Sequence, residues 1–399
     1  MSKKSKMHIG IVGPCDPREF QEFFSDSNLL RNYNVASSVN TYVKELLLQG
    51  YIVSVFSLYQ GFKNVIEYHS DRLNIYLIPR KMKLNMLSIF FPMYSGCRIS
   101  KIILKKIKEI DFLHAQWTYE YACAAQYFEK EKKVFCTVRD WCPYQLKVET
   151  RFFPKILWFI KYFVFLKVMH SRKTCFIANS EYTKSCILNA YPKKYVDVIP
   201  NPIQKEFFIN TKSLDCKYTF ISICNGIEEP RKNIMTLLRA FALYKKKHAD
   251  ASLCLIGEYD PNSQFQKNAE KENLLDGVFF AGSKSHREVF DYIDQSYCLV
   301  HPSKEETFGN ILLEGIARKT LCIGGKNSGA VPKVLGDGRF GILCDVCKAD
   351  SLYQAMEKSL DKNIYEAITE AAYAYVKETY SSDVVVQKTI QVYEKYLSN

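Results

Sequence analysis

Short apolar runs alternate with helix-length segments along nearly the whole chain, and this alternation restricts the fold more than any other feature. The run HIGIVG at residues 8–13 predicts a buried strand, because it is apolar throughout rather than at every second residue. A helical pattern then continues through VASSVNTYVKELLLQG to Gly50, and YIVSVFSL predicts a second strand. Strands joined by helices in this way are typical of a doubly wound parallel sheet, so the sequence predicts an α/β fold.

The alternation loosens near residues 203–217 and then begins again. YTFISICNG predicts a strand, KNIMTLLRAFALYKKK a helix and ASLCLIG the next strand. A chain of 399 residues is also too long for one ordinary core. We therefore predict two α/β domains, at 1–203 and 204–380, and a final helix at 381–399 that packs back on the first domain.

The chain has a formal charge of +13 at pH 7, which favours anionic partners such as nucleic acid, acidic membrane surfaces or phosphorylated small molecules. It begins with charged residues, and its 14 cysteines form no short-spaced framework, so we expect no signal peptide and reduced thiols in a cytoplasm. One CxxC spacing, from Cys344 to Cys347, has no second pair nearby, and we expect neither zinc nor redox chemistry there.

Two stretches, 80–108 and 151–173, mix lysine and arginine with large apolar and aromatic residues. Lys161 and Lys167 interrupt the second stretch, which makes it a poor membrane span. Each stretch either lies in a membrane interface, with its lysines reaching the headgroups, or forms core helices with a solvated basic edge. The sequence leaves both interpretations open.

Several distinctive residues fall at the carboxyl ends of predicted strands. In open parallel sheets, ligands bind beyond the carboxyl ends of the strands, so these positions are candidates for binding and catalysis. They are Gly13, His114, Asp140, Asn201, Asn225, Gly257 and the loop before Glu306.

The segment KEETFGNILLE, residues 304–314, predicts a loop and a helix that begins near Phe308. The free backbone amides of the first turn would form an anion site. These amides belong to Phe308, Gly309 and Asn310. Glu306 lies before the helix, and Glu314 lies about two turns along it. A ligand with a central pyrophosphate can therefore present a sugar to one of these glutamates and a ribose to the other. The alternative is a capped helix with one solvated glutamate.

The longer segment HPSKEETFGNILLEGIARKTLCIGG resembles the E-x7-E region of the retaining family 4 glycosyltransferases (glycosyl transferases group 1). NSGAVPKVLGDGRFGIL is similar to the stretch after that motif, EEPRKNIMTLLRAF to the basic phosphate-binding turn, and VIPNPI to the interdomain strand end. In the first half, DFLHAQWTYEYACAA and MHIGIVGP also resemble family segments. The resemblance covers nearly the whole chain and implies the GT-B fold, with two Rossmann-like doubly wound domains facing an interdomain cleft.

The resemblance also implies a role for each matching residue. Glu306 would contact the donor sugar, and Glu314 would bind the ribose of the nucleotide. Arg231 and Lys232 would neutralise the donor diphosphate as it leaves. Two cations at a helix start also suggest an anionic partner on electrostatic grounds, although a solvated helix start is the alternative. Gly13, after the first strand, is a further candidate for donor binding.

His114 and Asp140 are the candidate catalytic residues on the acceptor side. A histidine at a strand end can orient a sugar or a hydroxyl nucleophile, and an aspartate can accept its proton. The alternatives are a histidine satisfied within the sheet edge and an aspartate paired with Arg139.

The sequence departs from the family pattern at several positions. Ile227 stands where relatives have an arginine before the lysine, and Gln116 replaces the second histidine of an H-x-H pattern. Arg139 precedes Asp140 where relatives have a histidine. Residues 36–38, Ala-Ser-Ser, replace a Gly-Gly loop.

The resemblance implies a retaining glycosyltransferase of the hexosyltransferase type, which moves a sugar from a nucleotide-diphosphate sugar to a hydroxyl acceptor. We expect a role in bacterial surface polysaccharide biosynthesis (capsule, exopolysaccharide or O-antigen), with a glycan or lipid-linked sugar as acceptor. No Asp-x-Asp occurs in the sequence, so we expect no metal and no cofactor.

We expect a cytoplasmic protein at the inner face of the cytoplasmic membrane, with an anionic membrane surface as a partner and no nucleic acid. Two alternatives stay open at this point. One is a sugar-nucleotide epimerase or other GT-B enzyme, and the other is a non-enzymatic, basic, membrane-peripheral binding protein.

Overall fold

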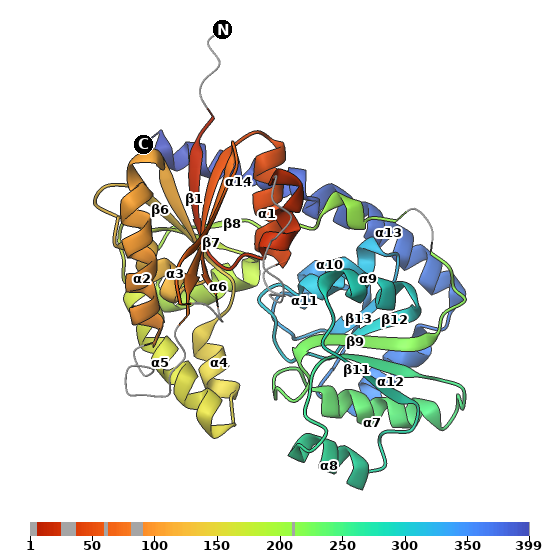
Figure 1. Cartoon of the computed structure of the whole chain (residues 1–399). Helices are drawn as coiled ribbons and strands as arrows, with labels where there is room; N and C mark the ends of the chain where they lie inside the picture. Colours follow the sequence, from red (N-terminus) through yellow and green to blue (C-terminus); the bar gives the residue numbers. More distant parts are fainter. Residues whose placement is uncertain (1–5, 25–36, 60–62, 81–90, 210–211, 399) are drawn as a thin grey trace. The chain divides into compact units, whose positions relative to one another are not determined.

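The computed structural model describes the chain except residues 1–5, 25–36, 60–62, 81–90, 210–211 and 399. Two compact units make up the chain (Figure 1). The first contains Met1–Pro202 and Ser382–Asn399, and the second contains Ile203–Ser381. Each unit has its own parallel sheet covered by helices, which confirms the predicted α/β fold with two Rossmann-like halves.

The sheet of the first unit has eight strands within the described residues, in the order β3-β4-β2-β1-β5-β6-β7-β8. Neighbouring strands pair in parallel except β3 and β4, which are antiparallel. The strands are β1 His8–Val12, β2 Ile52–Tyr59, β3 Ile66–His69, β4 Leu73–Pro79, β5 Phe112–Gln116, β6 Lys133–Val138, β7 Cys175–Ala178 and β8 Val196–Val198. The sequence did not predict β3, a short and half-exposed edge strand.

Helices cover both faces of this sheet. They are η1 Pro17–Phe23, α1 Ser37–Leu48, α2 Phe91–Lys106, η3 Ile107–Glu109, α3 Glu120–Gln126, α4 Cys142–Val148, α5 Phe152–Met169, α6 Glu181–Ala190 and α14 Ser382–Leu397. Side chains of β5 alternate between the two cores, because successive residues of a strand point to opposite faces. Leu113 packs in the core with α2, α3 and α5, whereas Phe112 packs in the core with α1 and α14.

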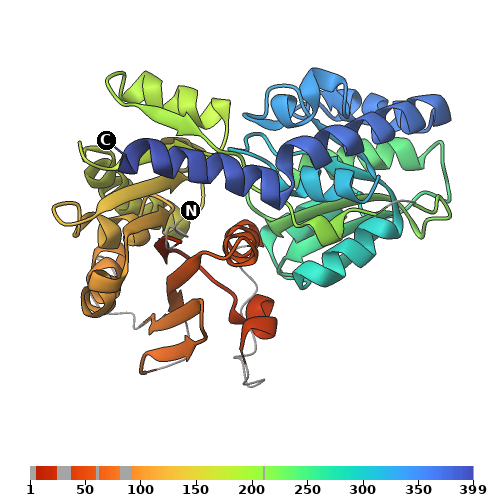
Figure 2. The same ribbon diagram turned by 90° about the horizontal axis from the view of Figure 1, so that it is seen from above.

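The last helix, α14, packs against the first unit (Figure 2). Its Val386 and Tyr393 are fully buried in the same core as α1. The Ser382 hydroxyl, at the start of α14, donates to the buried Glu45 carboxylate of α1 at 2.7 Å. A helix distant in sequence therefore completes one face of the first sheet.

The sheet of the second unit has six parallel strands within the described residues, in the order β11-β10-β9-β12-β13-β14. They are β9 Tyr218–Gly226, β10 Leu253–Glu258, β11 Val278–Gly282, β12 Ser296–His301, β13 Leu321–Gly325 and β14 Ile342–Cys344. The helices are η4 Lys205–Phe207, α7 Ile234–Lys245, α8 Gln264–Lys271, α9 His286–Asp294, α10 Asn310–Ala317, α11 Val331–Val334, η5 Gly336–Gly338, α12 Ala349–Lys358 and α13 Lys362–Tyr380. Buried residues of α7 and α12 cover one face, and those of α9, α10 and α13 cover the other.

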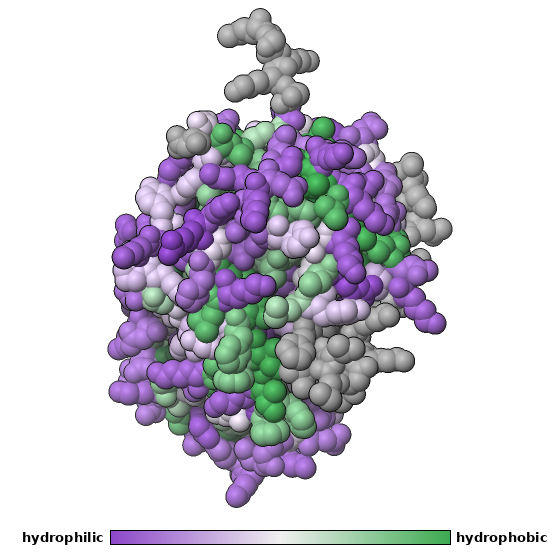
Figure 3. Space-filling model, turned by 90° about the vertical axis from the view of Figure 1, so that its left-hand side faces the viewer, coloured by the Kyte–Doolittle hydropathy of each residue, from purple (hydrophilic) through white to green (hydrophobic). Residues whose placement is uncertain are grey.

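The basic stretch at 151–173 forms α5, whose last turns are buried while its first turns are exposed. Residues 91–106 of the other basic stretch form α2, and its residues 81–90 lie outside the described part of the chain. Figure 3 shows the face on which these helices lie, with apolar side chains gathered in its lower half. No described helix combines the length and the apolar character needed to cross a membrane.

Candidate active site

The loop from β12 to α10 carries the predicted acidic motif. The helix begins at Asn310 rather than near Phe308, because Gly309 has a left-handed backbone with φ 94° and serves as the N-cap. The Phe308 side chain is buried, and its ring lies 5.7 Å from that of Tyr380. The chain therefore bends at Gly309, where the first turn of the helix was predicted, and the helix follows this bend.

Glu306 lies in this loop and contacts three basic side chains. Its Oε1 accepts hydrogen bonds from Arg231 Nη1 at 2.9 Å and Lys232 Nζ at 2.7 Å, and it lies 3.2 Å from His301 Nε2. Its backbone is fixed as well, because Ala330 N–H donates to the Glu306 carbonyl at 2.8 Å. The structure thus brings together Arg231, Lys232 and Glu306, which are three of the residues that the sequence singles out.

The turn between β9 and α7 positions the two cations. Asn233, which precedes α7, has a left-handed backbone with φ 58° and donates to the carbonyls of Pro302 and Val346. Arg231 Nη1 also donates to the Glu305 carbonyl at 2.8 Å, and the Arg231 carbonyl accepts from Lys304 N–H at 2.9 Å. The phosphate-turn candidate and the acidic loop are therefore joined by direct backbone contacts.

Nearby positive charges keep the Glu306 side chain ionised. Burial raises the pKa of Glu306, but Lys232 and Arg231 outweigh burial and hold that pKa well below its ordinary value. Burial lowers the pKa of His301, so its ring is neutral near pH 7. Two cations therefore face the Glu306 carboxylate, and Arg231 also forms a longer ion pair with Glu229, with 3.7 Å between Nη2 and Oε2.

The second glutamate of the motif lies on α10 and has a different partner. Glu314 Oε1 lies 3.2 Å from His286 Nε2, at the start of α9. The Glu314 side chain is 12% exposed, so it is mostly buried. The structure thus connects Glu306 with the cations and Glu314 with His286.

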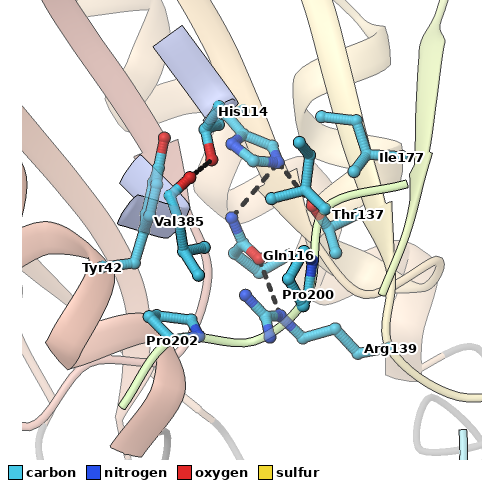
Figure 4. A pocket seen from close by; sticks show the side chains of 11 residues that line it. Tyr42, His114, Gln116, Thr137, Arg139, Ile177, Pro200, Pro202 and Val385 are labelled. Atoms are coloured by element: carbon cyan, nitrogen blue, oxygen red, sulfur yellow. Dashed lines mark hydrogen bonds between the residues drawn. The ribbon is translucent and has the colours of Figure 1, made fainter. Parts of the chain in front are cut away.

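His114, in the first unit, is enclosed by hydrogen bonds (Figure 4). Its Nδ1 lies 2.5 Å from Tyr393 Oη, and its Nε2 lies 2.7 Å from Thr137 Oγ1 and 3.3 Å from Gln116 Nε2. Burial lowers the pKa of His114 to about 3, so the ring is neutral at physiological pH. This geometry matches the alternative interpretation of a histidine satisfied within the sheet.

Arg139 lines the same small cavity and donates to several neighbours. Its Nε donates to Gln116 Oε1 at 2.8 Å, and its Nη1 donates to Ser38 Oγ at 3.1 Å and to Asn201 Oδ1. Burial lowers the pKa of Arg139 to about 10, so the guanidinium is still charged near pH 7. Ala36, which the sequence compares with a Gly-Gly loop, lies outside the described residues.

Asp140 and Gly13 complete the predicted residues of the first unit. Asp140 follows β6, and its carboxylate adds to burial in raising the pKa of the Tyr119 hydroxyl. Gly13 follows β1, where an added Cβ would lie 2.8 Å from Gln116 Cβ. Close packing between neighbouring strand ends therefore requires glycine at residue 13. The other predicted donor-binding residues all belong to the second unit.

Sequence reasoning missed two histidines, His301 and His286. His301 is the last residue of β12. Ligands bind beyond the carboxyl ends of parallel strands, so the reasoning that selected His114 could also have selected His301. His286 begins α9, and no local pattern indicates its contact with α10. Within the described residues, no group of three or more potential ligands is arranged to hold a metal ion.

Comparisons with known proteins identify the family. A family model described as Glycosyl transferases group 1 matches residues 210–375, and one described as Glycosyltransferase Family 4 matches residues 35–207. The chain belongs to the glycosyltransferases. The Arg231–Lys232–Glu306 cluster lies within the group 1 match, and His114, Arg139 and Asp140 lie within the Family 4 match.

Curated relatives of this glycosyltransferase match it over part of their length. The uncharacterized glycosyltransferase YqgM of Bacillus subtilis is 25% identical over 56% of this chain and 62% of its own. N-acetyl-alpha-D-glucosaminyl L-malate synthase of Bacillus anthracis is 30% identical over 41% of this chain and 42% of its own. A Campylobacter jejuni enzyme, N-acetylgalactosamine-N,N'-diacetylbacillosaminyl-diphospho-undecaprenol 4-alpha-N-acetylgalactosaminyltransferase, is 23% identical over 46% and 55%. The matches thus span less than two thirds of each of these relatives.

Solved structures match nearly all of the glycosyltransferase chain. Sucrose-phosphate synthase from Thermosynechococcus elongatus has a TM-score of 0.77 and 16% identity, over 98% of this chain and 100% of that one. Anabaena Alr3699/HepE in complex with UDP and glucose has a TM-score of 0.68 and 13% identity, over 98% and 100%. At these identities the likeness shows the fold, which is GT-B.

Proposed function

We propose that this glycosyltransferase moves a sugar from a nucleotide-diphosphate sugar to a hydroxyl acceptor. The observation that carries the proposal is the contact of Arg231 and Lys232 with Glu306. Both cations lie within the match to the group 1 family model. The resemblance to that family implies that they bind the donor diphosphate.

The charge of the cluster suits a diphosphate. Both cations contact Glu306, whereas Glu229 pairs only with Arg231, at 3.7 Å, so Lys232 and Arg231 together offer two positive charges to an incoming anion. Negative charge grows on the leaving diphosphate as the sugar departs, and fixed cations that need no rearrangement stabilise that charge. Gly309 and the first amides of α10 would add an anion-binding helix start beside the loop.

Glu306 acts in this proposal as a ligand of the donor sugar rather than as a nucleophile. Its depressed pKa keeps it an acceptor of hydrogen bonds from sugar hydroxyls at physiological pH. The proposed reaction retains the configuration of the sugar, with the leaving phosphate helping to deprotonate the acceptor. It needs no metal and no other cofactor, since the basic turn takes the place of an Asp-x-Asp site, a motif that the sequence lacks.

The candidates in the first unit receive different roles. We assign His114 a positioning role, because both of its ring nitrogens are hydrogen-bonded and its pKa of about 3 excludes proton uptake near pH 7. Asp140 remains the proposed acceptor-side base. Glu314 remains the proposed ribose ligand, with His286 holding its carboxylate.

The names of similar proteins guide the choice of substrates. The Anabaena structure is named as a complex with UDP and glucose, so a UDP-hexose is the first donor to test. The Campylobacter relative is named for a diphospho-undecaprenol acceptor, which supports a glycan or lipid-linked sugar as acceptor. We propose bacterial surface polysaccharide biosynthesis (capsule, exopolysaccharide or O-antigen), at the inner face of the cytoplasmic membrane, as the setting.

Turnover of the donor tests the proposal. A thermal-shift screen of nucleoside diphosphates selects the base, because a ligand that binds the folded state raises its apparent stability. Nucleoside diphosphate release from the matching sugar donor is then measured with Lys232→Ala and Glu306→Gln. We expect each variant to lose at least about 100-fold in kcat, as for other groups that stabilise developing charge.

Lys348→Ala is the matched control, because its side chain is 76% exposed in the same unit. It should release the nucleotide at the wild-type rate. Full activity in both site variants would contradict the proposal. Conversion of the donor with no glycoside formed would instead favour the epimerase alternative.

A further inference from the structure

The first turns of α5 expose an unusual number of large apolar side chains. Phe152 and Phe153 are 72% and 76% exposed, and four more of the first twelve residues are at least 43% exposed. These four are Ile156, Leu157, Phe159 and Phe163. Folded proteins seldom leave so many large apolar groups together in water unless the surface binds something.

The exposed residues share one side of the helix. At about 100° per residue, Phe152, Ile156, Phe159 and Phe163 form one row, and Phe153 and Leu157 form the next. Together the two rows cover a sector of about 160°. The last turns of α5 point other apolar residues into the core, where Phe165 and Val168 are buried. The helix is thus anchored at one end and presents a continuous apolar face at the other.

Basic residues border this face. The sequence contains no aspartate or glutamate between Glu149 and Glu181, but it contains six lysines and arginines there. On a helical projection, Lys155 and Lys161 lie on opposite edges of the apolar sector. Lys161 Nζ lies 4.5 Å from the Trp158 ring centroid, and Lys155 is exposed.

The neighbouring helix α2 has the same character. It contacts α5, and its Met93 and Tyr94 are 41% and 43% exposed. Its sequence also lacks acidic residues, and its Lys101 and Lys105 are exposed. In Figure 3 the apolar side chains in the lower half of this side of the molecule have hydrophilic ones to their left and below them. We call the exposed residues of α5 and α2 the basic aromatic face.

We propose that the basic aromatic face docks on the surface of an anionic lipid bilayer. Aromatic and aliphatic side chains would enter the headgroup region, and the bordering lysines would reach the lipid phosphates. A face of one charge sign fits a surface of the opposite sign. Neither helix carries an acidic side chain that would repel anionic headgroups, and neither belongs to a recognisable nucleic-acid-binding module.

This inference deepens the proposed function by naming where the enzyme meets the membrane that carries a lipid-linked acceptor. The docking itself does not depend on the sugar or the nucleotide. Vesicle binding and donor turnover can therefore fail separately, and each failure refutes a different statement.

Flotation of the full chain with lipid vesicles tests the proposal. The probes are vesicles of phosphatidylcholine alone and of phosphatidylcholine mixed with phosphatidylglycerol, at low and high salt. We expect binding to the anionic vesicles that weakens with salt. The variant Phe153→Ser/Leu157→Ser/Phe163→Ser should lose at least about tenfold in binding, since each removes a large apolar group from the interface.

Two further variants sharpen the result. Lys155→Gln/Lys105→Gln should bind anionic vesicles more than about tenfold less tightly and should change little on neutral ones. The control Leu48→Ser/Phe279→Ser/Leu360→Ser removes apolar side chains that are 64%, 52% and 39% exposed elsewhere, and it should bind like the wild type. Nucleotide binding should be unchanged in all three variants.

Several outcomes would overturn the proposal. They are absence of vesicle binding by the wild type, equal loss in the control variant, or equal binding to neutral vesicles at high salt. A wild-type dimer that the apolar variant dissociates would assign the face to a second copy of the chain. Duplex nucleic acid that displaces the vesicles at equal salt would assign it to that partner.

Discussion

Glu306 is a mostly buried carboxylate, 15% exposed, whose neighbours keep it charged. Burial alone would favour the protonated acid, but Lys232 and Arg231 reverse the direction of the pKa shift. The same contacts hold both cations in place beside the carboxylate, at 2.7 and 2.9 Å. A preorganised cation pair of this kind needs little rearrangement to receive a diphosphate, which is why we place donor binding there.

His114 gives the first unit a pH-dependent stability. In the folded protein its pKa is about 3, whereas the ordinary value is 6.5. As the pH falls below 6.5, the unfolded chain takes up this proton before the folded protein does. The stabilising contribution of neutral His114 is therefore complete above pH 6.5 and is lost as the pH falls toward 3.

We predict that His114→Gln removes this part of the acid sensitivity. Between about pH 7.5 and about pH 5, the wild type should lose about 2 kcal/mol more free energy of unfolding than the variant does. Urea titrations of both proteins at the two pH values measure the difference. Equal losses in both proteins would show that His114 titrates normally in the folded state.

Gly309 shapes the element that follows it. Its φ of 94° lies in a region that L side chains rarely adopt, and an added Cβ would lie 3.3 Å from Leu312 Cδ1. Local sequence indicated a helix near this residue, but a helical pattern does not show which residue turns the chain. The N-cap therefore became visible only in the structure.

We predict that Gly309→Ala lowers the free energy of unfolding by about 1–2 kcal/mol and weakens nucleotide binding, because the loop before α10 shifts. Gly282→Ala is the matched control, with a φ of 71° and no heavy atom within 4 Å of the added Cβ. Gly282→Ala should lower the free energy of unfolding through backbone strain but should leave nucleotide binding unchanged. Urea titration and nucleotide titration separate the two effects, and equal binding by both variants would refute a role for this turn.

The helix α14 is held to the first unit by its buried residues. Tyr393 is fully buried, and its hydroxyl lies 2.5 Å from both Tyr42 Oη and His114 Nδ1. The helical spacing of 381–399 indicated an amphipathic helix, and the packing partners on α1 and β5 come from residues far away in the sequence.

We predict that Tyr393→Ala lowers the free energy of unfolding by about 3–5 kcal/mol through the cavity it leaves. The exposed Tyr127→Ala, at 70% exposure, should change stability by less than about 0.5 kcal/mol. Denaturant unfolding measures both variants. A change in Tyr393→Ala no larger than that of the control would mean that α14 is not part of the first core.

At the scale of the whole molecule, the sequence predicted most of the fold. Continuous apolar runs identify strands buried on both faces, and both sheets consist largely of such strands. The edge strand β3 was missed because IEYH is short and half-exposed, so it lacks that pattern. The pattern of apolar residues predicts the architecture because it is visible in short stretches of the sequence.

The candidate site was predictable in part. Family motifs selected Arg231, Lys232 and Glu306, although 74 or more residues separate the cations from the acid. The contacts of His301 with Glu306 and of His286 with Glu314 were not predictable, because they join different elements and follow no local spacing. The buried state of His114 likewise depends on α14, which lies 279 residues further along the chain at Tyr393.

Calorimetric titration of UDP, with GDP and ADP beside it, into the wild type, Lys232→Ala and Glu306→Gln tests the central claim most directly. We predict that one of these nucleotides binds the wild type and that Lys232→Ala weakens this binding at least about tenfold. Glu306→Gln should bind the nucleotide at least as tightly as the wild type, because the two cations lose the one carboxylate that contacts both of them. Failure of all three nucleotides to bind, or equal affinity of Lys232→Ala and the wild type, would contradict the account.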